Sequence, residues 1–450
     1  MQPDLLPDIA IHRARRDRVI EKMGAGVMIL ATAPEVIRNR DAHFPYRHDS
    51  HFHYLTAFPE PEAVLVLIAG DSDKTPPKHI LFCREKDMER EIWDGFRFGP
   101  EAARELFHFD ATFAYDKLDE ELPKLLENQP TLHYAIGFDA AWDARMLGWL
   151  NAVRAKGRSG VSAPAALFDA RAIIDEMRLF KDAHELELMQ RAADISAAGH
   201  LAALRACRPG MGEWEIEAEL LYHFRKGGCQ APAYTSIVAG GANACVLHYV
   251  ANDQPLHAGD LLLIDAAGEY HGYAADITRT FPVNGRFSAP QRDIYEIVLA
   301  AQLAAIDAGK PGNTWNTPHD TALRVLTQGL RDLKLLDGDL DGLIEQEAFK
   351  PFYMHKTGHW LGRDVHDVGE YKIAGDDGNP DWRALQAGMT LTVEPGLYIR
   401  PSDDVPKIFW NIGIRIEDDV AVTPNGCHVL TAAAPKSIAE IEEVMRHASR

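Results

Sequence analysis

The 450-residue chain lacks the features that mark a disulfide-stabilised, thiolate-zinc or membrane protein. It has five cysteines, an odd number, and none of them belongs to a CxxC pair. This argues against a disulfide framework and against a cysteine zinc site, and it is typical of a reducing compartment. No apolar run approaches the ~20 residues that a helix needs to cross a bilayer, so we expect no membrane association.

Positive charge is also scarce. Lys and Arg number 47 against 67 Asp and Glu, which leaves a net charge of −20. Such an acidic chain has no general electrostatic footprint for nucleic acid. The first 18 residues, MQPDLLPDIAIHRARRDR, contain early acids and no continuous apolar stretch. We therefore predict no signal peptide and expect a cytoplasmic protein.

Two domains are expected, because 450 residues are too many for one ordinary core. Residues 1–176 alternate a polar helical run, HRARRDRVIEKM, with the buried strand-like runs GVMILATA, AVLVLIAG and HILFC. This alternation predicts an α/β domain with a mixed or parallel sheet.

Residues 177–450 follow a different pattern. Helices are predicted at 183–206, 213–227, 289–308 and 316–334, and strand-rich stretches with turn signals follow them. Asp182 is a plausible N-cap of the first of these helices, with Glu185 three residues later. Helices grouped against antiparallel strands predict an α+β domain.

Five polar residues lie within or at the ends of apolar strands in this second domain: Asp265, Asp276, His359, Glu394 and Glu417. Each alone could be a strand-end residue that reaches solvent. An unpaired buried carboxylate is costly, however, and four of them with a histidine are harder to explain in that way.

Two metal ions would resolve this conflict, because two divalent cations balance four carboxylates. Oxygen-rich ligation with a single imidazole favours Mn²⁺, although Zn²⁺, Co²⁺ or Fe²⁺ could occupy the same site. Two ions roughly 3.5–4 Å apart can share a hydroxide and stabilise a hydrolytic transition state.

The stretch LLLIDAAGEYHGYAADITRTFP carries the first two aspartates. A hairpin centred between Tyr270 and His271 would place Asp265 opposite Asp276, and the glycines at 268 and 272 suggest a loop wider than two residues. Like charges directly opposed in a sheet are destabilising. Cations between the two carboxylates would remove that cost.

The histidines of HKTGHWLGRDVHD could suggest a zinc helix, because His355 and His359 have i, i+4 spacing. Gly358 and Gly362 disfavour a helix, and no Glu follows His355, so we reject that motif. We predict strand and loop lining a cleft.

Two further residues are ambiguous from the sequence alone. His248, in ACVLHYV, has no local motif around it. Arg415 precedes Glu417 by two residues, so both point to one face of a strand. It could form a salt bridge in the sheet or orient carboxylates behind the metals, and the two interpretations are compatible.

These motifs resemble the pita-bread metallopeptidases, and within them aminopeptidase P, also called Xaa-Pro aminopeptidase. The five metal positions match one for one, in the same order and context. FPYRHDSHFHYLTAFPEPEAVLVL and EIWDGFRFGPEAA are similar to the N-terminal domain of aminopeptidase P. The resemblance therefore covers nearly the whole chain.

The resemblance implies a pita-bread C-terminal domain with internal pseudo-twofold symmetry, an α/β N-terminal domain, and a homodimer or homotetramer. It implies two divalent metal ions per subunit and peptide substrates with proline in second position. By motif match it assigns His248, His355 and His366 as outer histidines of the site. It assigns Tyr234, Tyr398 and Arg415 as supporting residues. It also implies that Trp93 caps the site of a neighbouring subunit.

The expected activity is hydrolysis of the Xaa-Pro bond by a metal-bridged hydroxide. Glu394 is our candidate for moving a proton to the leaving prolyl nitrogen. His248 or His366 would stabilise the oxyanion, and His355 would line the proline pocket.

Three alternatives stay open. A prolidase would use the same ligands on Xaa-Pro dipeptides, and the N-terminal motifs favour aminopeptidase P over it. A methionine aminopeptidase needs no such N-terminal domain. A non-catalytic pita-bread binding module would typically have lost metal ligands, as creatinases have, whereas all five are present here.

Overall fold

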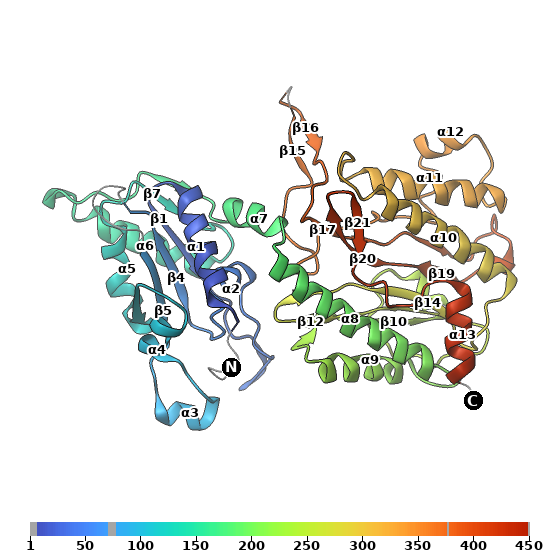
Figure 1. Cartoon of the computed structure of the whole chain (residues 1–450), viewed down its shortest axis with the longest axis horizontal. Coiled ribbons are helices and arrows are strands. Elements are labelled where there is room, and N and C mark those ends of the chain that lie inside the picture. The colour runs from blue at the N-terminus through green and yellow to red at the C-terminus, as the bar shows by residue number, and fades with distance from the viewer. Residues whose placement is uncertain (1–6, 71–77, 376–377, 449–450) are drawn as a thin grey trace. The chain divides into compact units, whose positions relative to one another are not determined.

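A computed structural model describes residues 7–70, 78–375 and 378–448, so residues 1–6 of the segment predicted not to be a signal peptide lie outside the described residues. The chain forms two compact units, Met1–Asp175 and Glu176–Arg450. Figure 1 traces both along the chain. None of the helices within the described ranges is both long and apolar enough to cross a membrane.

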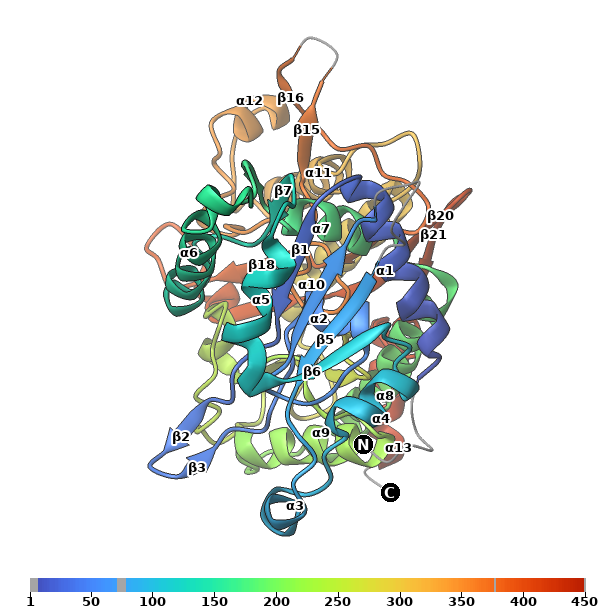
Figure 2. The same cartoon turned by 90° about the vertical axis from the view of Figure 1, so that its left-hand side faces the viewer.

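The N-terminal unit is built on a six-stranded sheet with the order β6-β5-β4-β1-β7-β8 (Figure 2). Strand β4 runs antiparallel to β1 and β5, and the other pairings are parallel. The predicted mixed sheet is thus confirmed. The strands are β1 (Val27–Ala31), β4 (Val64–Ile68), β5 (Lys78–Cys83), β6 (Ala111–Ala114), β7 (Thr131–His133) and β8 (Ala166–Phe168).

Helices cover both faces of this sheet. On one face α5 (Leu118–Leu126) and α6 (Ala140–Arg154) bury Leu122 and Leu150 against Val64 and Val66. Helices α1 and α2 lie on the other side (Figure 1). These two helices are α1 (Ile9–Met23) and α2 (Ser50–Thr56). The unit also contains α3 (Met88–Asp94), α4 (Gly99–Leu106) and a hairpin of β2 (Ile37–Asn39) and β3 (Ala42–His43).

The four helices predicted in the second domain are confirmed, with ends that differ by two residues at most. Asp182 and Glu185 form the predicted capping box at the start of α8. The last helix was not predicted, although Ser437 and Glu440 form a local cap before it. The helices are α7 (Arg171–Leu179), α8 (Ala183–Ala206), α9 (Glu213–Gly227), α10 (Ala289–Ala308), α11 (Thr317–Asp332), α12 (Leu340–Glu345) and α13 (Ile438–Ala448).

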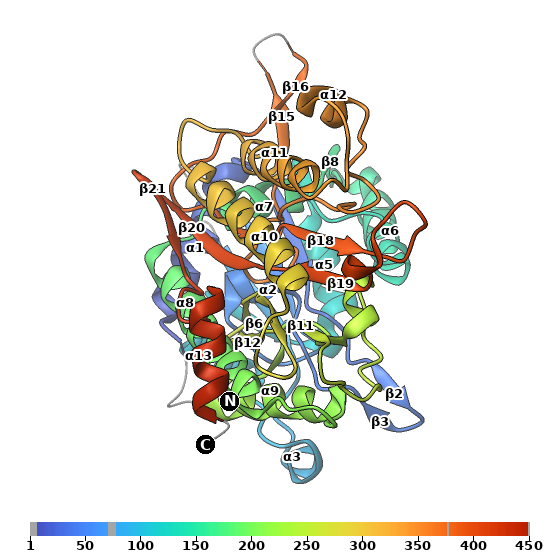
Figure 3. The same ribbon diagram turned by 90° about the vertical axis from the view of Figure 1, so that its right-hand side faces the viewer.

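The C-terminal unit repeats one order of elements. The helices α8 and α9 precede the antiparallel sheets β10-β11-β14 and β9-β12-β13, and α10 and α11 precede β17-β20-β21, β18-β19 and β15-β16. This is the order that internal pseudo-twofold symmetry requires. Figure 3 shows α10 beside β18, β19 and β20. The strands are β9 (Ala231–Pro232), β10 (Ile237–Gly240), β11 (Leu261–Asp265), β12 (Gly268–Tyr270), β13 (Tyr273–Ala274), β14 (Thr278–Pro282), β15 (Lys372–Ala374), β16 (Pro380–Trp382), β17 (Thr390–Val393), β18 (Gly396–Ile399), β19 (Ile412–Arg415), β20 (Asp418–Thr423) and β21 (Gly426–Val429).

The predicted register of the aspartate hairpin is wrong. Asp265 pairs with Thr278, and Tyr270 pairs with Tyr273. The loop contains only His271 and Gly272, whose φ angles are 49° and 75°. Two consecutive left-handed residues form the tight turn that matches the twist of a hairpin, so the turn moves one residue along the chain. Asp276 therefore lies diagonal to Asp265, between β13 and β14.

A buried arginine holds β14 against the segment that carries Glu417. The Arg279 side chain is 0% exposed and its Nη2 lies 2.6 Å from Asp418 Oδ1. Its Nη1 donates to the carbonyl oxygen of Glu417 at 2.5 Å, and Nη2 donates to that of Ala434 at 3.0 Å. Removal of one partner of such a pair leaves buried polar groups unsatisfied.

We expect Arg279→Met to lower the free energy of unfolding of the C-terminal unit by about 3–5 kcal/mol. The control is Arg324→Met, because the Arg324 side chain is 57% exposed where it pairs with Asp341. That control should change the value by less than about 0.5 kcal/mol. Urea titration measures both, and equal effects would contradict a buried structural role for Arg279.

Candidate metal centre

The five predicted metal ligands line one cavity of about 340 Å³ in the C-terminal unit. Asp265 ends β11, Glu394 directly follows β17, and Glu417 lies between β19 and β20. Asp276 and His359 come from the irregular segments before β14 and beside β17. The structure thus brings together residues from both halves of the unit.

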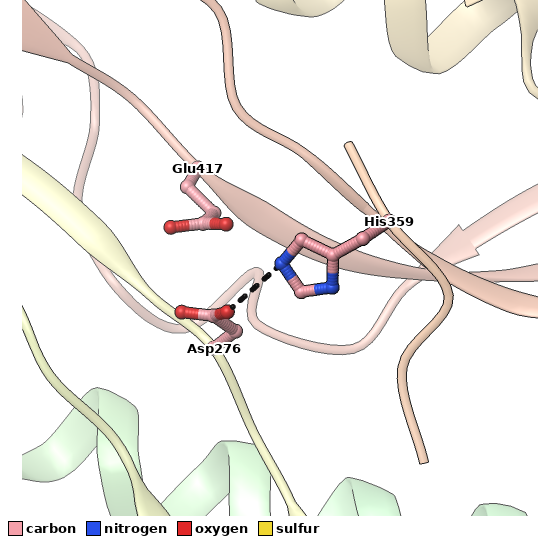
Figure 4. A group of neighbouring side chains, drawn as sticks. All are labelled: Asp276, His359 and Glu417. Carbon is pink, nitrogen blue, oxygen red and sulfur yellow. Dashed lines mark ion pairs between the residues drawn. The ribbon is translucent and has the colours of Figure 1, made fainter. Parts of the chain in front are cut away.

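Asp276, His359 and Glu417 form the tightest part of this group (Figure 4). Each offers one ligand atom within 4.8 Å of the others. His359 Nε2 lies 3.3 Å from Asp276 Oδ2 and 3.9 Å from Glu394 Oε1. The Nδ1 atom of His359 faces the carbonyl oxygen of Trp360 at 3.0 Å. A hydrogen bond there fixes the ring and directs Nε2 into the cavity, as metal-ligating histidines require.

A close backbone contact positions His359 and Glu394 together. The Glu394 N–H donates to the Thr357 carbonyl at 2.8 Å, and the Thr392 N–H donates to that of His359 at 3.0 Å. A Cβ at Gly358 would lie 2.1 Å from the carbonyl oxygen of Thr392, so only glycine allows this approach. The segment is not a helix, as predicted. Strand and loop were expected there. The segment is mostly loop, and its strand character is limited to one β-bridge between Trp360 and Leu391.

Hydrogen bonds orient the carboxylates from behind. The Tyr234 hydroxyl lies 2.6 Å from Asp265 Oδ1 and 2.5 Å from Asp276 Oδ1. Arg415 Nη2 donates to Asp265 Oδ2 at 2.5 Å, and the Thr278 hydroxyl donates to Glu417 Oε2 at 2.6 Å. Arg415 is therefore both a salt-bridge partner and an orienting residue.

A relay of hydrogen bonds leads from Arg415 to His355. Arg415 Nη1 donates to the Tyr398 hydroxyl at 3.1 Å, and that hydroxyl lies 2.8 Å from His355 Nε2. His355 Nδ1 lies 2.7 Å from the Lys356 carbonyl. Burial, followed by the charge of Arg415, lowers the pKa of His355 to about 3. The ring is thus neutral, with both nitrogens engaged.

The other predicted outer residues differ in their positions. His248 and His366 both line the cavity, and the His366 ring meets the His359 ring edge-to-face at 4.2 Å. Trp93 belongs to α3 in the N-terminal unit and is 83% exposed. Its contact with a neighbouring subunit stays a prediction.

Several positioning residues were missed from the sequence. Asp419, 1% exposed, accepts the Asp276 N–H at 3.0 Å. Its signal was its place two residues after Glu417, in the run IEDD. Arg178 and Lys181 pair with Asp367 at 2.5 and 3.0 Å, and so hold the loop that presents His366.

A buried carboxylate holds the segment that carries His248. Glu213, 0% exposed, accepts hydrogen bonds from the Gly240 N–H, the Tyr249 hydroxyl and the Gln254 N–H, at 2.8, 2.7 and 3.0 Å. Both ends of segment 240–254 are therefore tied to one side chain. No sequence motif marked Glu213, because its partners are backbone and side-chain groups of a loop that is distant in the sequence.

The electrostatics of the cavity favour positive ligands. Burial raises the pKa of Asp265 and of Glu417, and the neighbouring carboxylates add to the rise for Glu417. Burial also raises the pKa of Glu394 to about 7. Burial lowers the pKa of His359, but the hydrogen bond to Asp276 and nearby carboxylates outweigh it and raise the pKa to about 9. Without cations the group thus retains protons.

The donor set fits divalent metal ions. Four carboxylates and one imidazole converge on a cavity that Arg415 and Lys356 line with positive charge. Carboxylate oxygens suit hard ions such as Mn²⁺, and a single imidazole also suits Zn²⁺, Co²⁺ or Fe²⁺.

Comparisons with known proteins agree with this geometry. The profile of metallopeptidase family M24 matches residues 187–424. The chain belongs to metallopeptidase family M24. The profile of the aminopeptidase P N-terminal domain matches residues 12–134. The resemblance seen in the sequence is confirmed, and M24 members are hydrolases.

The family relatives match over nearly the whole chain. The chain is 44% identical to the Xaa-Pro aminopeptidases of Haemophilus influenzae and Escherichia coli, over 96% of both chains in each case. The structure of Pseudomonas aeruginosa aminopeptidase PepP matches with a TM-score of 0.95 and 49% identity, over 98% of this chain and 99% of that chain. An Escherichia coli aminopeptidase P variant in complex with substrate matches with a TM-score of 0.94 and 42% identity, with the same coverage. The pita-bread fold is thereby confirmed.

The raised pKa values predict how pH affects the metal-free protein. Glu394 and His359 bind protons more tightly in the folded protein than in the unfolded chain, where their pKa values are the ordinary 4.5 and 6.5. The stability they contribute is full below those values and is lost as pH rises through about 7 and about 9. Cations must displace the same protons. We therefore expect the rise in Tm caused by saturating Mn²⁺ to grow between about pH 5.5 and pH 8.5. A rise in Tm that is constant or shrinks over this range would contradict the assignment.

Proposed function

We propose that this chain is an Xaa-Pro aminopeptidase, which removes the N-terminal residue from peptides with proline in second position. The convergence of four carboxylates and His359 in one cavity carries this proposal. The aminopeptidase P N-terminal domain at residues 12–134 supports it over other M24 activities. The same activity is named for the relatives that are 44% identical.

The proposed metal ligands are Asp265, Asp276, His359, Glu394 and Glu417. Two divalent ions, with Mn²⁺ the best fit to these oxygen donors, would supply Lewis-acid polarisation of the scissile carbonyl and activation of water near neutral pH. Arg415, Tyr234 and Thr278 would keep the carboxylates in their binding orientation, since each already donates a hydrogen bond to at least one of them.

Proton transfer is assigned to Glu394. Its carboxyl group lines the cavity beside His359, where it can take a proton from attacking water and deliver it to the prolyl nitrogen. The prolyl nitrogen leaves as an amine, so it depends on a delivered proton. Ring N–H groups of His248 or His366 would stabilise charge on the carbonyl oxygen.

His355 would line the proline pocket. Both of its nitrogens are engaged, by the Tyr398 hydroxyl and the Lys356 carbonyl. The ring therefore offers its carbon edges and faces to a ligand, which suits the apolar ring of proline.

We also propose the finer properties that the family resemblance implies. Residues 1–176 would form the N-terminal domain and residues 177–450 the catalytic domain. The chain would form a homodimer or homotetramer in which Trp93, 83% exposed, caps the site of a neighbouring subunit. All five cysteines are unpaired, which suits a cytoplasmic protein.

Asp276→Asn should lower kcat/KM for an Ala-Pro-Ala tripeptide at least about 100-fold, because a metal ligand is lost. Removal of metal with a chelator should abolish activity, and Mn²⁺ should restore it. The control is Asp341→Asn, at a position that is 70% exposed and pairs with Arg324; it should keep full activity. Full turnover by Asp276→Asn or by a verified metal-free preparation would overturn the site. A chain that binds no divalent metal would instead be a binding module.

Substrate length separates the proposed function from a prolidase. We expect Ala-Pro-Ala and longer peptides to be cleaved with a higher kcat/KM than the dipeptide Ala-Pro. Chromatographic measurement of the free alanine released gives the rate of cleavage of each peptide under the same Mn²⁺ loading. Activity confined to the dipeptide would identify a prolidase instead.

A further inference from the structure

A second cavity, of about 430 Å³, lies behind the segment that carries the catalytic histidines. Lys356, Thr357 and Gly358 of that segment line it, whereas His355, Lys356 and His359 line the metal cavity. Lys356 is thus common to both. The rest of the wall comes from the segments at the start of α11, at β15 and β16, and at β17, and it includes Trp315, His319, Tyr371, Lys372, Trp382 and Thr392.

The walls of this second cavity are aromatic. The Trp315 ring packs 4.5 Å from Tyr371 and 4.1 Å from the buried Trp360. The ammonium of Lys372 lies over the Trp382 ring at 4.4 Å. Flat rings of this kind bind apolar and aromatic groups well.

The charge of the second cavity is opposite to that of the chain. Two lysines and a histidine line it, and no Asp or Glu does, although the chain has a net charge of −20. Within residues 7–70, 78–375 and 378–448, neither Lys356 nor Lys372 forms an ion pair with a carboxylate. Burial, followed by the charge of Lys356, lowers the pKa of His319 to about 4. The positive charge of Lys356 therefore reaches His319 in the cavity wall.

The back wall of the second cavity is bonded to the metal ligands. The Thr357 hydroxyl lies 2.9 Å from His319 Nδ1, and the Thr357 carbonyl accepts the Glu394 N–H. The Thr392 hydroxyl accepts the His359 N–H at 3.1 Å. A molecule bound in this cavity would be separated from Glu394 and His359 by a single backbone segment.

We propose that the second cavity binds the free carboxylate end of a peptide, with an apolar or aromatic side chain against Trp315 and Trp382. Lys356 and Lys372 pair with the carboxylate. The choice of a peptide rests on the proposed function, since its substrates and products all end in a carboxylate. The peptide could be the tail of the substrate in the metal cavity or a separate molecule.

The test uses N-acetyl-Ala-Phe and its C-terminal amide, which have no free amine and are not aminopeptidase substrates. Calorimetric titration should show the acid binding about tenfold more tightly than the amide. Lys372→Gln should weaken binding of the acid about fivefold and leave the amide unchanged, as expected for one partly exposed ion pair. Trp382→Ala should weaken both probes.

The matched control is Lys350→Gln. Lys350 is an exposed lysine that pairs with Glu347 and lies outside both cavities. It should bind both probes as the wild type does. Equal binding of acid and amide, or equal effects of the two lysine variants, would overturn the proposal.

Turnover of Ala-Pro-Gly-Phe and its amide identifies the source of the carboxylate. A preference for the acid that disappears in Lys372→Gln supports the substrate's own tail. Equal turnover of acid and amide, with tight binding of N-acetyl-Ala-Phe, supports a separate peptide. Probe binding without any Xaa-Pro cleavage overturns the proposed function alone. Cleavage without preference for the acidic probe overturns the cavity alone.

Discussion

Repulsion among four carboxylates in one cavity is the constraint on which the C-terminal unit depends. Two like charges about 4 Å apart repel by about 4 kcal/mol at an effective dielectric constant near 20. Arg415 offsets part of this through its pair with Asp265. His359 offsets more of the repulsion while its ring is protonated, and the neighbouring carboxylates raise its pKa to about 9. The proposed divalent cations would relieve the rest, so the fold and the chemistry would have the same requirement.

The fold places a layer of polar residues behind the residues that line this cavity. Tyr234 and Thr278 bond carboxylate oxygens, and Asp419 accepts the backbone N–H of Asp276. Glu213 and Arg178 act further out, because each holds a loop that presents a histidine to the cavity. Side chains fixed in this way need little rearrangement when metal or substrate binds.

Local signals predicted much of this structure. The capping pair Asp182 and Glu185 and the apolar periodicity placed α8 correctly, and acids in apolar strands pointed to residues that line one cavity. The hairpin register was missed because it depends on the backbone angles of His271 and Gly272. The pair of Arg178 and Asp367 joins residues 189 positions apart, and neither lies in a motif. Contacts of that kind depend on the tertiary fold, so periodicity and spacing do not reveal them.

The central claim is that two cations lie among Asp265, Asp276, His359, Glu394 and Glu417. Anomalous diffraction from crystals grown with Mn²⁺ tests it most directly, because it locates the metal without relying on activity. The account predicts two peaks per chain inside this cavity, roughly 3.5–4 Å apart. Absence of a peak there, or a single peak bound elsewhere on the chain, would contradict it.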